Sequence, residues 1–291
     1  MIRSKQFPAR PSGSRVGVVL LLIALVFACV AVLSSKAGFP LLSFEPLVAL
    51  TRYLPFVNPQ PSLPPLDSPP NASSSFENTL TLERQSWYAI QVGAYDTQDA
   101  AAEAAATLRA RGGAGYVIQD GAYRLLVACY PSRAEAEEVM NRLVSSGEYG
   151  ASAIYRLNAD EMIISLIATP LQASALSQAY SLLPEMIQEL SRLALALDRG
   201  SMDASAVRAS AGTSMNRAKQ LLSTMDLAIT DPRPDIVREL RALLETAAAT
   251  MEQIVHSDSG ALPLSSQIKY NHVDLLWRYV QYVKRMSALG A

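Results

Sequence analysis

The chain has 291 residues, half of them hydrophobic, which is enough for about two domains with buried cores. Its net charge is −1 and no basic stripe runs along it, which argues against a nucleic-acid-binding protein. The two cysteines, Cys29 and Cys129, lie far apart in different kinds of segment, so the sequence offers no disulfide framework.

The first predicted element is an apolar run from Val16 to Leu33. Together with the two serines that follow, it is long enough to cross a bilayer core of ~30 Å, so we expect a transmembrane helix over residues 16–35. Basic residues precede the run, and only Lys36 follows it closely. The positive-inside rule therefore predicts a cytoplasmic tail over residues 1–15 and a single-pass protein of the cell membrane, with the bulk of the chain outside the cytoplasm.

Two alternatives explain the same apolar run. One is a cleaved signal peptide with a cleavage site at Ser35-Lys36-Ala37, and the other is a lipoprotein anchor at Cys29. Each alternative delivers the rest of the chain to the same side of the membrane.

Residues 36–85 are rich in proline and serine, including Pro64-Pro65 and Pro69-Pro70. This composition predicts an extended, semi-rigid linker.

Residues 86–157 have the pattern of a β-α-β-β-α-β unit. Polar and apolar residues alternate in the first strand, an alanine-rich helix ends at Gly112-Gly113, and Asp120-Gly121 is a hairpin turn signal. Ser132 and Glu135 form a capping-box pattern at the second helix. The predicted strands are residues 87–93, 116–119, 123–129 and 151–156, and the helices are residues 98–111 and about 132–147.

Three motifs lie on these elements: Gln91–Tyr95 in the first strand, Tyr123–Val127 in the third strand and Ser132–Ala136 at the second helix. With them, residues 86–157 resemble the SPOR domain of bacterial cell-envelope proteins. The resemblance implies an α+β fold in which the helices cover one sheet face and leave the other open. It also implies a ligand, peptidoglycan glycan strands stripped of their stem peptides, and a role in cell division or sporulation.

Strand alternation places Ile90 and Val92 toward the helices, and Gln91, Arg124 and Leu126 on the open face. The resemblance implies that the glycan lies on that face. Gln91 and Arg124 match binding positions of the family. Ala94, where a small residue is usual, and Leu126 complete the predicted glycan site.

The chain departs from the family pattern at two places. Ala122 stands where an aromatic residue is frequent, and Ala128-Cys129 stands where Gly-Pro is usual. These departures predict weaker stacking on sugars.

Residues 160–291 show helical periodicity and no strand signals, and we expect an all-α bundle of four antiparallel helices with short loops. Thr169-Pro170 is the start signal of the first helix, and Pro184 inside it predicts a kink. The predicted helices are residues 169 to about 199, 203 to about 229, 235 to about 256, and 264 or 265 to 288.

The sequence carries no constellation that indicates catalysis. His256 and His272 are its only histidines, with no third ligand at metal spacing, and no nucleophile motif is present. We expect no catalytic residue, metal or cofactor, and we favour a non-enzymatic, membrane-anchored peptidoglycan-binding protein acting in cell division, sporulation or envelope organisation. The alternative is an envelope scaffold or regulator whose helical bundle binds a protein partner, with the SPOR-like module structural.

Overall fold

The computed structural model describes residues 75–147, 149–229 and 235–290. The chain divides into two compact units, residues 1–66 and 67–291, and all described residues belong to the second. The predicted cytoplasmic tail, the transmembrane helix and most of the linker lie outside the described residues. Among the helices of the described ranges, none has both the length and the apolar character needed to cross a membrane.

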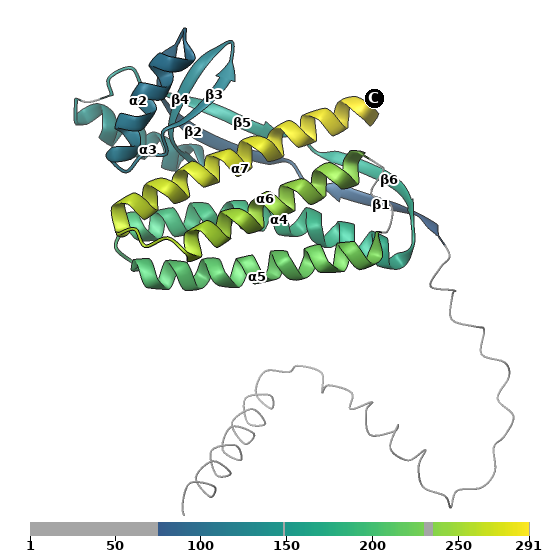
Figure 1. Cartoon of the computed structure of the whole chain (residues 1–291). Helices are drawn as coiled ribbons and strands as arrows, with labels where there is room; N and C mark the ends of the chain where they lie inside the picture. The colour runs from purple at the N-terminus through teal and green to yellow at the C-terminus, as the bar shows by residue number, and fades with distance from the viewer. Residues whose placement is uncertain (1–74, 148, 230–234, 291) are drawn as a thin grey trace, which may run out of the picture. The chain divides into compact units, whose positions relative to one another are not determined.

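Residues 85–159 form a four-stranded antiparallel sheet with two helices, which confirms the β-α-β-β-α-β order. The strands lie in the order β3-β4-β2-β5 (Figure 1). Thr97 and Ser132 cap the two helices with their hydroxyl groups, and Gly121 makes the β3–β4 turn with a φ of 67°. The bounds are β2 Gln85–Tyr95, α2 Gln98–Ala110, β3 Tyr116–Asp120, β4 Ala122–Tyr130, α3 Arg133–Ser145 and β5 Ala153–Ala159.

Two strands outside the predicted module pair with each other. β1 (Phe76–Leu82) runs antiparallel to β6 (Met162–Ala168). Leu82 is opposite Met162, and three residues farther along Gln85 is opposite Ala159, so the register of β2–β5 continues into β1–β6. β1 and β6 therefore form a two-stranded ribbon that continues the β2–β5 pair, interrupted only at residues 83–84 and 160–161.

The prediction of a linker up to residue 85 and of a strand-free region after residue 160 is wrong at this ribbon. The β1 segment alternates clearly only over Thr79–Leu82, and the β6 segment is apolar on both faces, so neither gives a period-2 signal along its whole length. Their extended form depends on mutual pairing across about eighty residues of sequence, which a local pattern does not reveal.

The four predicted helices of the C-terminal region are confirmed, with ends close to the expected ones. Thr169 and Gln172 exchange hydrogen bonds in a complete capping box, and Pro170 occupies the first turn. α4 continues beyond Pro184. The bounds are α4 Pro170–Asp198, α5 Ala204–Ala228, α6 Asp235–Val255 and α7 Ala261–Gly290.

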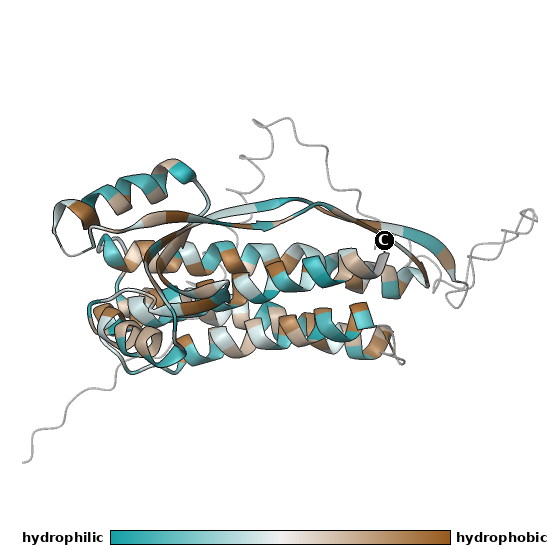
Figure 2. Cartoon of the chain, turned by 90° about the horizontal axis from the view of Figure 1, so that it is seen from above, coloured by the Kyte–Doolittle hydropathy of each residue, from teal (hydrophilic) through white to brown (hydrophobic). Residues whose placement is uncertain are grey.

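Two hydrophobic cores lie on the two faces of the sheet. The first packs Ile90 and Leu125 against Ala105 of α2 and Ala136 of α3. The second is larger and joins the opposite sheet face to the bundle, and Figure 2 shows the long strands running alongside the bundle helices. The prediction of one open sheet face is therefore wrong, because the C-terminal helices cover most of it.

Candidate functional site

Helix α7 packs across the sheet face that the sequence predicts to be open. The rings of Trp87 and His272 meet edge to face with centroids 5.0 Å apart, and those of Tyr116 and Tyr270 meet likewise at 5.1 Å. The Tyr116 hydroxyl donates a 2.9 Å hydrogen bond to the Asp274 carboxylate. These aromatic contacts and the charge-assisted hydrogen bond hold α7 in one position on the sheet.

The loop after α2 is tied to the same helix. Ser266 of α7 donates to the carbonyl of Gly113 at 2.7 Å, and the Lys269 ammonium donates to the carbonyl of Gly112 at 2.9 Å. Lys269 also forms an ion pair with Asp198 of α4 at 2.7 Å, with its own side chain only 14% exposed. One lysine thus connects α7, α4 and the module.

His272 lies at the centre of this junction and acts as a core aromatic residue. It is buried, its Nε2 atom has no hydrogen-bond partner, and burial lowers its pKa to about 3. The imidazole is therefore neutral near pH 7. Within the described ranges, no three His, Cys, Asp or Glu side chains gather as a possible metal site.

The four residues of the predicted glycan site differ in burial. Leu126 is fully buried in the core shared with the bundle, so its predicted place on an open face is wrong. Ala94 is exposed, and Gln91 and Arg124 are half-buried. The structure brings the last two together, since Arg124 Nη1 donates to Gln91 Oε1 at 3.1 Å.

Asp120, Arg124, Gln91 and Tyr155 form a polar row that crosses the sheet from β3 through β4 and β2 to β5. The Arg124 guanidinium lies over the Tyr155 ring, 5.4 Å from its centroid, and its Nε donates to the Asp120 carbonyl at 3.1 Å. The Tyr155 hydroxyl donates to the Asp120 carboxylate at 2.6 Å. The polar row is therefore a connected network.

The polar row is open to solvent, whereas the neighbouring part of the face lies under α7. The side chains of Arg124 and Asp120 are 30% and 54% exposed. Partial burial and the hydrogen bond to Asp120 raise the pKa of Tyr155 to about 12, so this residue is a neutral phenol. The row thus presents guanidinium and amide donors, carboxylate and amide acceptors, and an aromatic ring.

Sequence reasoning missed two members of the polar row. In the sequence, Asp120 indicates only the hairpin turn with Gly121, and no pattern assigns a role to Tyr155. The pairing of β5 with β2, in which Tyr155 is opposite Ala89, places Tyr155 on the same face as Gln91. Tyr155 supplies an aromatic ring to this face, from β5 rather than from the family position occupied by Ala122.

The other departure from the family pattern lies in the interior. Ala128 and Cys129 are both buried, Ala128 toward α2 and α3 and Cys129 toward the bundle. Burial raises the pKa of the Cys129 thiol, so the residue is an inert part of the core.

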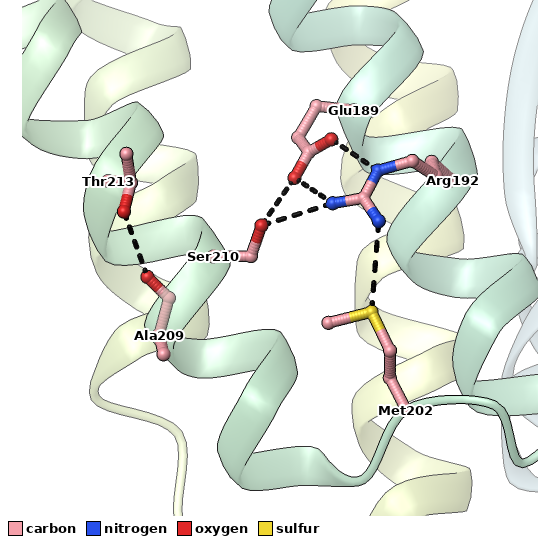
Figure 3. A network of polar contacts seen from close by, with 6 residues as sticks. All are labelled: Glu189, Arg192, Met202, Ala209, Ser210 and Thr213. Atoms are coloured by element: carbon pink, nitrogen blue, oxygen red, sulfur yellow. Dashed lines mark hydrogen bonds and ion pairs between the residues drawn. The ribbon is translucent and has the colours of Figure 1, made fainter. Parts of the chain in front are cut away.

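A cleft of about 560 Å³ lies away from the polar row, between the start of α3 and helices α4 and α5. In this cleft Arg192 binds Glu189 at 2.6 Å, and Ser210 donates to Glu189 at 2.7 Å (Figure 3). The Arg192 hydrogen bond keeps the pKa of Glu189 low. Arg217 and Glu185 form a second pair at 2.8 Å. These contacts join α4 to its neighbours and supply structural stability rather than chemistry.

The four-stranded sheet and its two helices form a small α+β module fused to a helical bundle. A comparison with protein-family models matches the SPOR domain at residues 71–119 and 88–155. The chain therefore contains a SPOR domain, a non-catalytic peptidoglycan-binding domain of division-related proteins. No curated protein and no solved structure matches the chain.

Proposed function

We propose that this chain is a non-enzymatic, membrane-anchored protein that binds denuded peptidoglycan glycan and acts in cell division, sporulation or envelope organisation. Residues 16–35 would form the anchor, and the SPOR domain would bind glycan outside the cytoplasmic membrane. The observation that carries the proposal is the polar row, which occupies the solvent-exposed end of the sheet face of a SPOR domain.

The polar row suits a sugar chain chemically. Arg124 offers a planar fork of donors for the carboxylate of muramic acid or for an N-acetyl carbonyl, and Gln91 both donates and accepts. The Tyr155 ring provides an apolar face beside them, and Asp120 accepts from sugar hydroxyls. Because these side chains already hold one another, binding requires little additional ordering.

The cover formed by α7 limits the length of the site. Trp87, Tyr116 and Leu126, which share the sheet face with Gln91, are buried against the bundle. Glycan can therefore contact only the end of the sheet, and we expect it to bind as a short segment or as a chain end.

The test measures binding of the full-length, detergent-solubilised protein to cell-wall sacculi treated with amidase and to untreated sacculi. Gln91→Ala and Arg124→Ala should each weaken binding to the denuded sacculi by roughly 5–30-fold, since each removes one contact worth about 1–2 kcal/mol. Both variants should keep the wild-type melting temperature.

Arg133→Ala is the matched control. Like Arg124, this arginine has a carboxylate partner four residues away, Glu137, but it lies on α3. It should bind sacculi as the wild type does. Equal binding by wild type, Gln91→Ala and Arg124→Ala would contradict the polar row as the glycan site.

The membrane topology has its own test. The basic residues before Val16 motivate the proposal that residues 40–291 lie outside the cytoplasmic membrane. Protease added to intact protoplasts should then digest this part of the chain. Protection in intact protoplasts, with digestion only after lysis, would contradict the topology.

A second function is favoured by the cover that α7 forms on the sheet. If the sheet face serves to dock the bundle, the SPOR domain is a structural platform, and the protein is an envelope scaffold or regulator whose bundle binds a protein partner. Failure of the wild-type protein to bind any sacculi would favour this function.

A further inference from the structure

The outward face of β6 holds two large apolar side chains in solvent. Ile163 is 65% exposed and Ile167 is 80% exposed, and both lie on this face of β6. Phe76 is 49% exposed as well, but it pairs with Ala168 and therefore lies on the opposite face of the ribbon. Large apolar side chains gathered at one place on a surface indicate a contact that the isolated chain does not make.

The same strand has a free edge. Among the strands in the described part of the chain, β6 pairs only with β1, which leaves the opposite row of its backbone groups unpaired. Exposed strand edges are usually blocked by charges or proline. Residues 162–168 contain neither, so nothing in β6 prevents another strand from pairing with it.

The β1 edge is less suited to pairing. Glu77 lies on its outward face, opposite Ile167 in the ladder. Residues Thr79–Leu82 also line a groove with Tyr180 and Pro184 of α4, so part of the bundle lies beside β1. An incoming strand therefore meets fewer obstacles at β6.

We propose that β6 pairs with β6 of a second copy of this chain, antiparallel and centred on Ser165. A two-fold axis through Ser165 places Ile163 opposite the partner's Ile167 and Ile167 opposite the partner's Ile163. Each exposed isoleucine then packs against an isoleucine of the other copy as a cross-strand pair, and the backbone groups of the two free edges bond to each other in a self-complementary interface. The two ribbons become one continuous four-stranded sheet.

Charge supports the same register. Antiparallel pairing about Ser165 brings Glu161 beside the partner's Thr169, which is the N-cap of α4. The first turn of α4 contains no acidic residue, so its positive end lacks a negative neighbour within its own helix. Glu161 of one copy supplies that charge to the helix of the other.

The contact is short, and a two-strand junction of this size falls below the area of a permanent dimer. We therefore expect a dimer that depends on concentration and is favoured where copies are confined together. A covalent trap is the appropriate measurement.

The experiment introduces Ser165→Cys into the full-length protein with Cys29→Ser, leaving the buried Cys129 in place. Across the proposed axis the two new thiols lie at the spacing of a directly opposed strand pair, which permits a disulfide. Mild oxidation should give a disulfide-linked dimer on a non-reducing gel.

Thr79→Cys in the same background is the matched control. Thr79 is paired with Ser165 and shares its outward face, but it lies one strand farther from the axis. Two such thiols would be about 14 Å apart, three strand spacings, and cannot bridge. Cross-linking by both variants alike, by Thr79→Cys alone or by neither would overturn the proposal.

Adding Ile167→Lys to Ser165→Cys tests whether cross-linking depends on the β6–β6 contact and not only on the presence of the new thiol. Because Ile167 is 80% exposed, the fold should keep its melting temperature. The cross-linked fraction should fall severalfold, while binding to denuded sacculi stays at the wild-type level. An unchanged cross-linked fraction would contradict the β6–β6 contact, whatever the outcome for the glycan site.

Discussion

Both faces of the four-stranded sheet are covered by helices, but the helices on the two faces lie at different distances from the strands along the chain. One face is covered by α2 and α3, which follow directly on strands of the same module. Their contact residues include Ala101, Ala105 and Ala136, which are fully or almost fully buried. Small side chains let these helices lie close to the sheet, and the local sequence pattern is enough to predict them.

The other face is covered by α7, which lies more than one hundred residues farther along the chain. The contact uses larger groups, including Trp87, Tyr116 and His272, with polar links at its margins. The comparison shows that part of the surface of a module recognised from local sequence becomes buried when the module is fused to a second element. The remaining exposed end of the sheet is where the polar row lies.

The largest expected effect tests whether the second face is a true core. Leu126→Ala should reduce the free energy of unfolding by about 2–5 kcal/mol, because the side chain is fully buried between the sheet and the bundle. Leu125→Ala, on the first face, should cost a similar amount. Chemical denaturation followed by circular dichroism measures both.

An open second face would give a different pair of results. Leu125→Ala would still destabilise the protein, whereas Leu126→Ala would change the free energy of unfolding by only a few tenths of a kcal/mol, roughly the effect of a surface substitution. That outcome would restore the open sheet expected from the sequence.

The next effect uses pH to probe the same junction. Burial lowers the pKa of His272 to about 3 from an ordinary value of 6.5. Between these two pKa values the unfolded chain binds a proton that the folded chain does not. The free energy of unfolding is therefore undiminished by His272 above pH 6.5 and falls as the pH decreases below it. At pH 5 the loss due to His272 should be roughly 2 kcal/mol, at about 1.4 kcal/mol per pH unit.

Urea denaturation at pH 7 and pH 5 measures this loss. His272→Gln should lower stability at pH 7 but should lose about 2 kcal/mol less than the wild type between the two pH values. The same pH dependence in both proteins would show that His272 is not buried as a neutral group.

Much of the fold could be predicted from local chemistry. Hydroxyl caps at Thr97, Ser132 and Thr169 and the Asp-Gly turn mark element ends through short-range hydrogen bonds, and the structure agrees. The β1–β6 ribbon and the α7 cover could not be predicted, because their formation depends on partners distant in sequence.

The candidate site shows the same division. Alternation correctly grouped Gln91 with Arg124 on one face, and they are hydrogen-bonded. It also placed Leu126 there, but alternation defines a face and not what covers it. Asp120 and Tyr155 were missed because they reach the row from opposite edges of the sheet, and only the strand order β3-β4-β2-β5 brings them together.

A smaller effect is expected at the margin of the second face. Tyr116→Phe keeps the ring against Tyr270 but removes the hydroxyl group that donates to Asp274. Asp274 retains its 2.8 Å ion pair with Arg278, so the carboxylate is not left without a partner. The free energy of unfolding should fall by about 1 kcal/mol, and binding to sacculi should be unchanged. A large loss of sacculus binding would mean that α7 positions the polar row directly.

The smallest effect is expected at the joint between the sheet and the ribbon. Arg84 and Asp160 form an ion pair there at 3.6 Å, with side chains 65% and 74% exposed. Water and salt screen such a pair, so Arg84→Ala should change the free energy of unfolding by at most about 0.5 kcal/mol. Lys269→Ala is the informative comparison, because Lys269 is shielded and joins Asp198 to the Gly112 carbonyl. It should cost clearly more in the same denaturation experiment. An equal loss of unfolding free energy for Arg84→Ala and Lys269→Ala would mean that side chains, and not the shared backbone register, hold the joint together. The β1–β6 ribbon would then bend at this joint, whereas the shared register predicts a rigid extension of the sheet.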